Sequence, residues 1–334
     1  MAIIVVPKDA PTIQSAVIDA MSDDLIFVKK GNYNESVDII GKSIAIIAEK
    51  GAILDGENSL LYGFRVANSN IEIKGFKIQN YLEYGIKQEG FSQIASYIEN
   101  TIQNIGKDGI TIVNNSDSLC VIWKNKIRKI SENGINIQNA FATNVLIIQN
   151  AIEDVLNNGI NVTSFERAGT IFENIIRKVG NEGIVFQFIN SAAVLGNKIS
   201  HARQNGISTN GQGYILSKND TKYNGSNGLE VNGAFDGINY IEENTSSDNK
   251  KDGISINQDN NFIIRNKAKD NGDDGIDLNS NNNEVVENFV CNNGDKDIEN
   301  NGVNNQFFRN EVCDDSILDA HDHHHHESSD ESSS

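Results

Sequence analysis

The hydrophobic positions of this chain alternate with polar ones in short runs, and each run begins directly after a glycine. In Ile135-Asn136-Ile137 and Ile254-Ser255-Ile256 every second residue is apolar, which is the period of a half-buried β-strand. The glycines that open such runs are Gly85, Gly109, Gly134, Gly159, Gly183, Gly206, Gly228, Gly253 and Gly275. The residue before them is mostly Asn or Asp, which favours a tight turn. The pattern predicts one strand-and-turn unit repeated every 22 to 25 residues.

A second marker, an Asn flanked by apolar residues, recurs in step with the glycines. Its members are Asn100, Asn125, Asn150, Asn174, Asn197, Asn219, Asn244, Asn266, Asn288 and Asn310. Two markers that share one period predict a solenoid. A coil this short has no room for a crossover helix, and parallel connections are right-handed in nearly all cases. We therefore expect an all-β fold, a single-stranded right-handed parallel β-helix (solenoid) of about 12 coils, with two strands and two turns in each coil.

In such a stack, equivalent residues of adjacent coils lie about 4.8 Å apart. The recurrent Asn side chains are then expected to form a structural ladder, in which each amide bonds to its copy on the next coil.

The open ends of a solenoid need caps, and the N-terminal one is visible in the sequence. Residues 1–40 are expected to form this cap and the first coil, with a strand at Ile3 to Val6. Thr12 is a candidate helix N-cap, and Ile13, Ala16, Val17, Ala20 and Met21 fall on one helical face. We expect the β-helix to span residues 41–318. Residues 319–334 contain only Asp, His, Glu, Ser and one Ala, and they are expected to be disordered.

The first coils also resemble a known superfamily. Thr12-Ile13-Gln14-Ser15-Ala16-Val17, Gly31-Asn32-Tyr33-Asn34-Glu35 and Ile53-Leu54-Asp55-Gly56 resemble the entry to the pectin lyase-like superfamily, and the Asn repeats resemble its generic β-helix repeats. The resemblance covers roughly residues 1 to 315 and implies a capping helix followed by the first coils. It implies no single activity, since the superfamily includes lyases, hydrolases, esterases, epimerases, phage tailspikes and non-catalytic surface proteins.

Motifs that would select one of these activities are missing. The nearest segment to the mannuronan epimerase motif, Tyr84-Gly85-Ile86-Lys87-Gln88-Glu89, lacks both the Asp and the His of that motif.

Charge and hydropathy narrow the range of partners. The formal net charge of −18 argues against nucleic acid and against docking on anionic membranes. It also weakens binding to polyuronates unless Ca²⁺ mediates the contact. No run of 18 apolar residues predicts membrane insertion, and the first residues do not resemble a signal peptide, so cytoplasmic synthesis is expected.

The polar side of the strand after each glycine is a candidate ligand-binding face. Its amides are Asn136, Gln138, Asn161, Gln187, Asn210, Asn232, Asn257 and Asn279. Amides in regular rows can hydrogen-bond the hydroxyls of a polysaccharide. The alternative is a solvated face that prevents aggregation. Carboxylates crowd the later coils, at Asp248, Asp252, Asp270, Asp273, Asp274 and Asp277, and they fit either a Ca²⁺ site or plain solubility.

A charged cluster three or four residues past the ladder positions is a weaker catalytic candidate. Arg128, Glu153, Arg177 and His201 should stack on consecutive coils. Such a set could supply the base and the cations of a β-elimination lyase. The alternative is a row of surface salt bridges.

Two further features suggest metal or redox chemistry. His321, His323, His324, His325 and His326 would bind a divalent transition metal adventitiously. Cys291 and Cys313 should stack one coil apart, where a Cα separation of about 4.8 Å permits a disulfide. Free thiols are favoured over an intramolecular or intermolecular crosslink, because parallel in-register side chains suit a disulfide dihedral poorly.

The combined interpretation is a non-catalytic surface or structural rod that presents a lateral face to a glycan or envelope protein at a cell or spore surface. The alternative is a polysaccharide lyase, epimerase or glycosidase with a divergent site, and a third is metal handling by the tail. No required cofactor is expected, and the sequence does not predict the oligomeric state.

Overall fold

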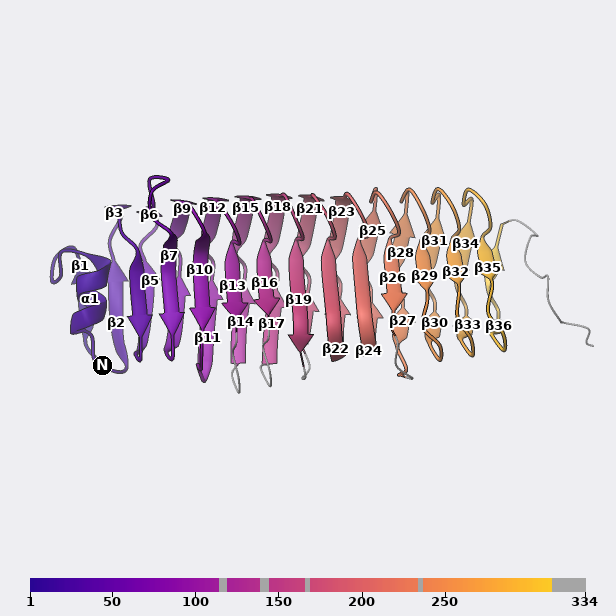
Figure 1. Cartoon of the computed structure of the whole chain (residues 1–334), viewed down its shortest axis with the longest axis horizontal. Coiled ribbons are helices and arrows are strands. Elements are labelled where there is room, and N and C mark those ends of the chain that lie inside the picture. Colours follow the sequence, from indigo (N-terminus) through magenta and orange to yellow (C-terminus); the bar gives the residue numbers. More distant parts are fainter. Residues whose placement is uncertain (114–118, 139–143, 166–168, 234–236, 314–334) are drawn as a thin grey trace, which may run out of the picture.

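The computed structural model describes residues 1–113, 119–138, 144–165, 169–233 and 237–313. These residues form a right-handed parallel β-helix whose coils stack along one straight axis, with α1 (Ile13–Asp19) over the N-terminal end (Figure 1). Every strand pairing is parallel and joins a strand to its equivalent on an adjacent coil, as from Ile135 to Ile160. The predicted fold class is confirmed.

Most coils carry three strands rather than the two expected from the sequence. A typical coil contains β12 (Thr101–Ile105), β13 (Ile110–Val113) and β14 (Leu119–Trp123). The prediction of two strands was wrong because it placed the ladder Asn inside a strand. The residue before each ladder Asn has a positive φ, such as 53° at Gln149. The chain therefore bends there, and Asn150 lies between β17 (Asn144–Ile148) and β18 (Ala151–Val155).

The three strands of each coil build three faces. Face one is the 13-stranded sheet of β3 (Gly31–Tyr33), β6 (Ala52–Asp55), β9 (Lys77–Tyr81), β12, β15 (Lys126–Ile130), β18, β21 (Ile175–Val179), β23 (Lys198–Ala202), β25 (Asp220–Lys222), β28 (Thr245–Ser247), β31 (Lys267–Lys269), β34 (Phe289–Cys291) and β37 (Glu311–Val312). Face two, where the runs after the glycines lie, holds β4 (Val37–Ile40), β7 (Tyr62–Ala67), β10 (Tyr84–Glu89), β13, β16 (Ile135–Gln138), β19 (Ile160–Phe165), β22 (Ile184–Leu195), β24 (Ile207–Ser217), β26 (Leu229–Asn232), β29 (Ile254–Ile256), β32 (Ile276–Leu278) and β35 (Ile298–Asn300).

Face three continues from face two. It holds β1 (Ile3–Val6), β2 (Asp24–Val28), β5 (Ser43–Ala48), β8 (Asn70–Lys74), β11 (Ile94–Ile98), β14, β17, β20 (Gly169–Phe172), β27 (Tyr240–Glu242), β30 (Phe262–Ile264), β33 (Glu284–Val286) and β36 (Gln306–Phe308). The long strands β22 and β24 run through both faces, so the two belong to one 24-stranded sheet. Inward Ile and Val side chains from all three faces fill the core, and many of them are fully buried.

The recurrent Asn residues form one continuous ladder at the corner between faces three and one. Asn150 is typical: its backbone N–H and its Nδ2 both donate to Oδ1 of Asn174, at 2.8 and 3.0 Å, and Nδ2 also donates to the Ile122 carbonyl at 2.8 Å. The same bonds run from Asn100 to Asn310. Side chains therefore satisfy backbone groups that the bend leaves unpaired.

The N-terminal cap has the expected helix start. The Thr12 side chain accepts from the Ser15 backbone, and the Ser15 side chain accepts from the Thr12 backbone. This capping box satisfies two backbone N–H groups of the first turn. Ile13, Ala16 and Val17 are buried. The expectation for Met21 was wrong, because the helix ends at Asp19 and the Met21 side chain is exposed.

The last two coils are joined covalently. Cys291 and Cys313 form a disulfide across a Cα–Cα distance of 4.9 Å. The expectation of free thiols was wrong, because stacking one coil apart places the two Cα atoms within the usual reach of a disulfide. The expected disordered tail, 319–334, and its His321 to His326 tract lie outside the described residues.

Candidate functional site

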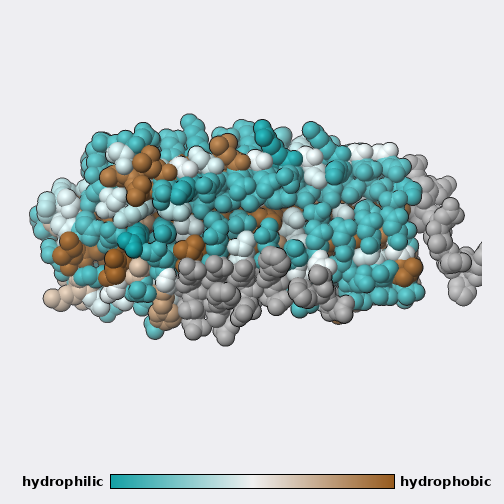
Figure 2. Space-filling view, in the orientation of Figure 1, coloured by the Kyte–Doolittle hydropathy of each residue, from teal (hydrophilic) through white to brown (hydrophobic). Residues whose placement is uncertain are grey.

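Two rows of polar side chains run along face two and its leading corner. The turn row comprises the residue before each repeat glycine from Gly109 to Gly275, and Lys296, which precedes Asp297 at the glycine position of the next coil: Asp108, Asn133, Asn158, Glu182, Asn205, Asn227, Asp252, Asp274 and Lys296. The strand row comprises the second residue after each of these glycines and after Asp297; it pairs in register from coil to coil and is polar except at Val185: Thr111, Asn136, Asn161, Val185, Ser208, Glu230, Ser255, Asp277 and Glu299. We call the two rows together the acidic strip. The strands that carry it face the viewer in Figure 1, and the same side is largely hydrophilic in Figure 2.

The turn row is a second side-chain ladder. Oδ1 of Asp108 accepts the backbone N–H of Asn133 at 2.9 Å, and Oδ1 of Asp252 accepts that of Asp274 at 3.2 Å. Asn133 and Asn158 make the same bond to the following coil, at 3.3 and 3.1 Å. Asn and Asp therefore hold the same place in successive coils and accept from the same backbone group.

Two amides of the predicted ligand-binding face are not available to a ligand. Asn136 is 4% exposed and donates to Oδ2 of Asp108 at 2.8 Å, and Asn161 donates to Oδ1 of Asn136 at 2.9 Å. Their assignment to an open face was wrong, because both amides are buried and are used in bonds between adjacent coils.

The remaining predicted amides lie two residues further along face two, beside the strip. Gln138, Gln187, Asn257 and Asn279 are exposed, and Asn210 and Asn232 are half-buried. Asn257 donates to Asn232 at 2.9 Å, and Asn301 donates to Asn279 at 3.0 Å. These amides form an accessible margin along the acidic strip.

Near the centre of the strip lie two carboxylates, Glu182 just before β22 and Glu230 in β26, with β24 between these strands. Glu182 is 9% exposed, and its Oε2 is buried without a hydrogen-bond partner. Burial, and then the charge of Glu230, raise the pKa of Glu182 to about 7. Glu230 lies in a different environment: its half-buried Oε2 accepts from Nδ2 of Asn205 at 2.8 Å and from Oγ of Ser208 at 3.1 Å. One carboxyl of the strip therefore has a pKa near neutrality, while a second one, two coils along, is oriented by two donors.

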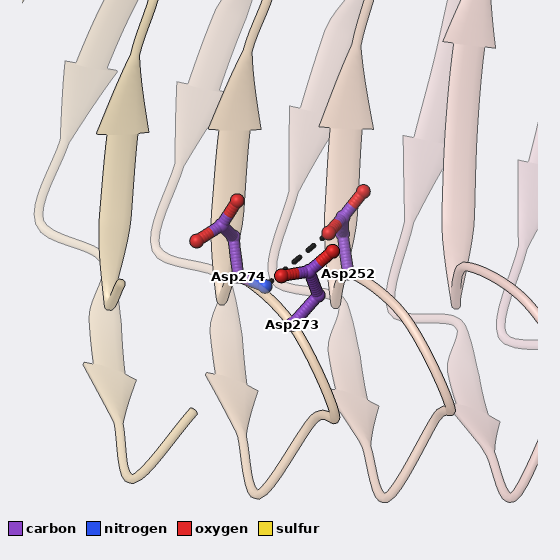
Figure 3. A group of neighbouring side chains, drawn as sticks. All are labelled: Asp252, Asp273 and Asp274. Carbon is purple, nitrogen blue, oxygen red and sulfur yellow. Dashed lines mark hydrogen bonds between the residues drawn. The ribbon is translucent and has the colours of Figure 1, made fainter. Parts of the chain in front are cut away.

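The C-terminal end of the strip is the most acidic part. Burial is the main cause that raises the pKa of Asp252 to about 6 and of Asp274 to about 7, and it also raises that of Asp277. The Asp274 backbone N–H donates to Asp252, and the Asp273 side chain lies next to this bond (Figure 3). In the group of Asp252, Asp273 and Asp274, one oxygen of each lies within 4.8 Å of the others. Such a group is a candidate for binding a hard cation.

The charged cluster predicted as a catalytic alternative lies on face one, apart from the strip. Arg128, Glu153, Arg177 and Ser200 pair in register on consecutive strands, although the sequence placed them in turns. Arg128 bonds to Oε1 of Gln103 at 2.7 Å, and Glu153 pairs with Lys178 at 3.1 Å. His201 lines a surface hollow of about 370 Å³ with Lys178, Arg203 and Asp154. Of these two contacts, the one from Glu153 to Lys178 is a surface ion pair and the one from Arg128 is a hydrogen bond to an amide.

Sequence reasoning missed Glu182, Glu230 and Glu299 as site residues. The available signal was an acidic residue at a repeat position where other coils carry Asn, Ser or Thr. The burial that shifts the pKa values of these residues could not be predicted in the same way. It arises from the stacking of neighbouring coils, which the sequence of a single coil does not show.

Replacing Glu182 by Gln should make stability less dependent on pH. Because the folded-state pKa of Glu182 is raised to about 7, its contribution is complete below about pH 4 and is lost as pH rises through about 7. We expect the urea midpoint of the wild-type protein to fall between pH 5 and pH 8. Glu182→Gln should reduce the accompanying loss in free energy of unfolding by about 1–2 kcal/mol, a value already discounted for residual solvent access. The exposed variant Glu132→Gln should leave it unchanged. Equal pH dependence in wild type and Glu182→Gln would contradict the prediction.

The fold and the stacked rows define a class, the right-handed parallel β-helix. A family model described as the right handed beta helix region matches residues 84–234 and 182–320, so the chain belongs to this family. It is a member of the pectin lyase-like superfamily, as its first coils indicate. None of the curated proteins matches the chain. Within the part of the chain that the structure describes, no helix is both long and apolar enough to cross a membrane.

Solved structures share the fold at low sequence identity. The A-module of mannuronan C-5 epimerase AlgE6 from Azotobacter vinelandii superposes with a TM-score of 0.56 and 12% identity, over 87% of this chain and 91% of that one. The Dettilon tailspike protein gives 0.57 and 14%, over 93% and 68%. The receptor binding domain of the Siphovirus 9NA tailspike gives 0.50 and 13%, over 96% and 78%. Polysaccharide epimerases and phage tailspikes therefore share this fold.

Proposed function

We propose that this protein binds a polysaccharide along the amide margin of the acidic strip. The observation that carries the proposal is a row of accessible amide side chains in register on successive coils of face two: Gln138, Gln187, Asn210, Asn232, Asn257 and Asn279. A straight polar face of this kind offers the same donors and acceptors at each coil spacing of about 4.8 Å, which suits a polymer better than a compact ligand. The β-helix neighbours named for mannuronan epimerisation and receptor binding support this direction.

The negative charge of the acidic strip indicates which class of polysaccharide would bind beside it. Glu182, Glu230, Asp252, Asp274 and Asp277 lie on this face, in a chain of net charge −18. They would repel a polyuronate, whereas a neutral polymer would meet no such barrier and an amino-sugar polymer would be attracted. A rod displayed at a cell or spore surface, as expected from the sequence, would present this face to glycans or to an envelope protein.

Retention on polysaccharides tests the proposal. We expect wild-type protein to bind neutral or amino-sugar polymers more tightly than alginate in affinity electrophoresis. Replacing the exposed Asn257 and Asn279 by Ala should weaken retention at least about tenfold, since two hydrogen-bonding side chains are lost. The matched control is Arg128→Ala on face one, which should bind as wild type does. Binding that is equally lost in both variants, or absent for every neutral and amino-sugar polymer, would contradict the proposal.

A second candidate function, hydrolysis of the bound polymer, rests on the Glu182 and Glu230 pair. Glu182, protonated near neutral pH, can donate its proton to the glycosidic oxygen as the bond from that oxygen to the anomeric carbon breaks. Glu230 can accept a proton from the water whose oxygen bonds to the anomeric carbon. Both carboxyl groups regain their starting states when product release is followed by proton exchange with solvent.

The variant Glu182→Gln separates hydrolysis from binding. If Glu182 is the acid, this change should lower the rate of chain shortening at least about 100-fold while retention on the same polymer is kept. Unsaturated product ends would instead indicate a lyase. Retention without any shortened chains in the wild type would leave binding as the function and exclude hydrolysis of that polymer.

A further inference from the structure

Three carboxylates converge where the acidic strip enters the last described coils. Asp274 ends the turn before β32, Asp277 lies in β32, and Glu299 lies in β35. Asp277 and Glu299 occupy the same register on adjacent strands. One oxygen from each of the three lies within 4.8 Å of the other two. Like charges placed directly opposite one another on neighbouring strands destabilise the pairing unless something neutralises them.

The side chains present neutralise this group only in part. Lys296 Nζ pairs with Glu299 Oε1 at 3.0 Å, and the Lys296 backbone N–H donates to Asp274 Oδ1 at 2.9 Å. Oδ2 of Asp277 accepts from Ser255 Oγ at 3.3 Å and from Asn279 Nδ2 at 2.5 Å. Oδ1 of Asp277 is buried with no partner in the described part of the chain, and the side chain is 8% exposed. A buried, unpartnered carboxylate oxygen is costly and marks a place for a missing ligand.

We infer that Asp274, Asp277 and Glu299 bind a divalent cation, with Ca²⁺ as the preferred ion. A cation would give Asp277 Oδ1 its missing partner and balance the charge that Lys296 leaves. Carboxylates are hard ligands, which favours Ca²⁺ or Mg²⁺ over metals that prefer His or Cys. Ca²⁺ fits better than Mg²⁺, because it accepts irregular coordination completed by water, whereas Mg²⁺ needs a near-ideal octahedron.

The neighbouring group of Asp252, Asp273 and Asp274 is a weaker site for the ion. Asp273 is exposed, and Oδ1 of Asp252 already accepts the Asp274 N–H (Figure 3). Asp252 and Asp273 therefore add negative potential around Asp274 without offering a buried oxygen that lacks a partner. The ion would join β32 to β35, one coil from the end of the described chain, where the Cys291–Cys313 disulfide also joins two coils.

Calorimetric titration of the full-length protein with CaCl₂ at pH 8 tests this site without any polysaccharide. We expect one site with a dissociation constant of about 10⁻⁴ to 10⁻³ M, the range of extracellular Ca²⁺ modules. Asp277→Asn and Glu299→Gln should each weaken binding at least about tenfold, because each removes one of three charged ligands. The exposed Asp248→Asn changes the net charge by the same amount and should bind as wild type does.

Thermal unfolding provides a second readout. Ca²⁺ should raise the Tm of the wild-type protein and of Asp248→Asn, but not that of Asp277→Asn. In EDTA, Asp277→Asn should melt at or above the wild-type Tm, because one of the opposed charges is gone. Wild-type Ca²⁺ affinity in both Asp277→Asn and Glu299→Gln would place the ion elsewhere and overturn the assignment. Absence of binding to wild type up to about 10 mM, well above the range of such sites, would overturn it as well. Either result leaves the polysaccharide proposal standing, since that proposal requires no metal.

Discussion

Replacing Asn174 by Ala is expected to lower the free energy of unfolding by about 3–5 kcal/mol, a loss large enough to endanger folding. Asn174 is fully buried in the middle of the ladder. Its Oδ1 accepts the backbone N–H and the Nδ2 of Asn150 at 2.8 and 3.0 Å, and its own Nδ2 donates to Oδ1 of Asn197 at 3.0 Å and to the Ile147 carbonyl at 2.9 Å. Ala would leave these groups buried and unpaired, which costs more than the bonds themselves contribute.

The measurement is the urea unfolding midpoint of Asn174→Ala against wild type, with the exposed Asn144→Ala as the matched control. Asn144 begins β17 one coil away, so the control changes the same residue type without breaking the ladder. We expect the control to lie within about 0.5 kcal/mol of wild type. A similar small change for Asn174→Ala would show that the ladder contributes little.

The second large effect is expected from Gly159→Ala. A Cβ at this position would lie 2.6 Å from the Gly183 carbonyl oxygen and 2.5 Å from Cγ2 of Ile176. The obstacle is close approach between coils, because the same contact recurs at Gly109 and Gly134. Relief requires the backbone of one coil to move away from the next, which breaks parallel hydrogen bonds on face two. We expect a loss of about 2–4 kcal/mol and a shift of at least several degrees in Tm.

The control for this prediction is Gly41→Asn. Gly41 has a φ of +65°, and a Cβ there would meet nothing within 4 Å. Asn tolerates this left-handed conformation better than other residues with a side chain, so the variant should lose little stability. If Gly159→Ala were as stable as Gly41→Asn, the contacts between coils would have to be looser than the structure shows.

The sequence predicts the architecture well because two kinds of residue, the turn Gly and the ladder Asn, repeat with the same period. Residues equivalent to Gly159 and Asn174 recur in the central coils, so their spacing in the sequence predicts the length of each coil and the stacking of one coil on the next. The number of strands per coil escaped prediction because the positive φ before each ladder Asn occurs at ordinary residues such as Gln149 and Glu173. Nothing in those residue types marks a corner.

The candidate site was only partly predictable, for a related reason. The sequence identifies Asn136 as polar and outward from the core, yet the structure buries it beneath Asp108 of the adjacent coil. Burial of Glu182 and Asp277 likewise depends on side chains 22 to 25 residues away. Period-two patterning reports which face of a strand points to the core, and it says nothing about how crowded the other face becomes.

The stacking of one coil on the next also determines how the chain responds to mechanical force. Each central coil pairs only with its two neighbours, so a pull on the ends would load the coils in series. A coil that detaches releases 22 to 25 residues of chain. At the full extension of about 3.4 Å per residue this adds roughly 80 Å of contour length per event. The bond between Cys291 and Cys313 encloses one such coil, so this segment adds almost nothing to the extension until the bond is reduced. Under force, the coils would therefore unfold in steps of similar length, except for the coil that the Cys291–Cys313 disulfide closes.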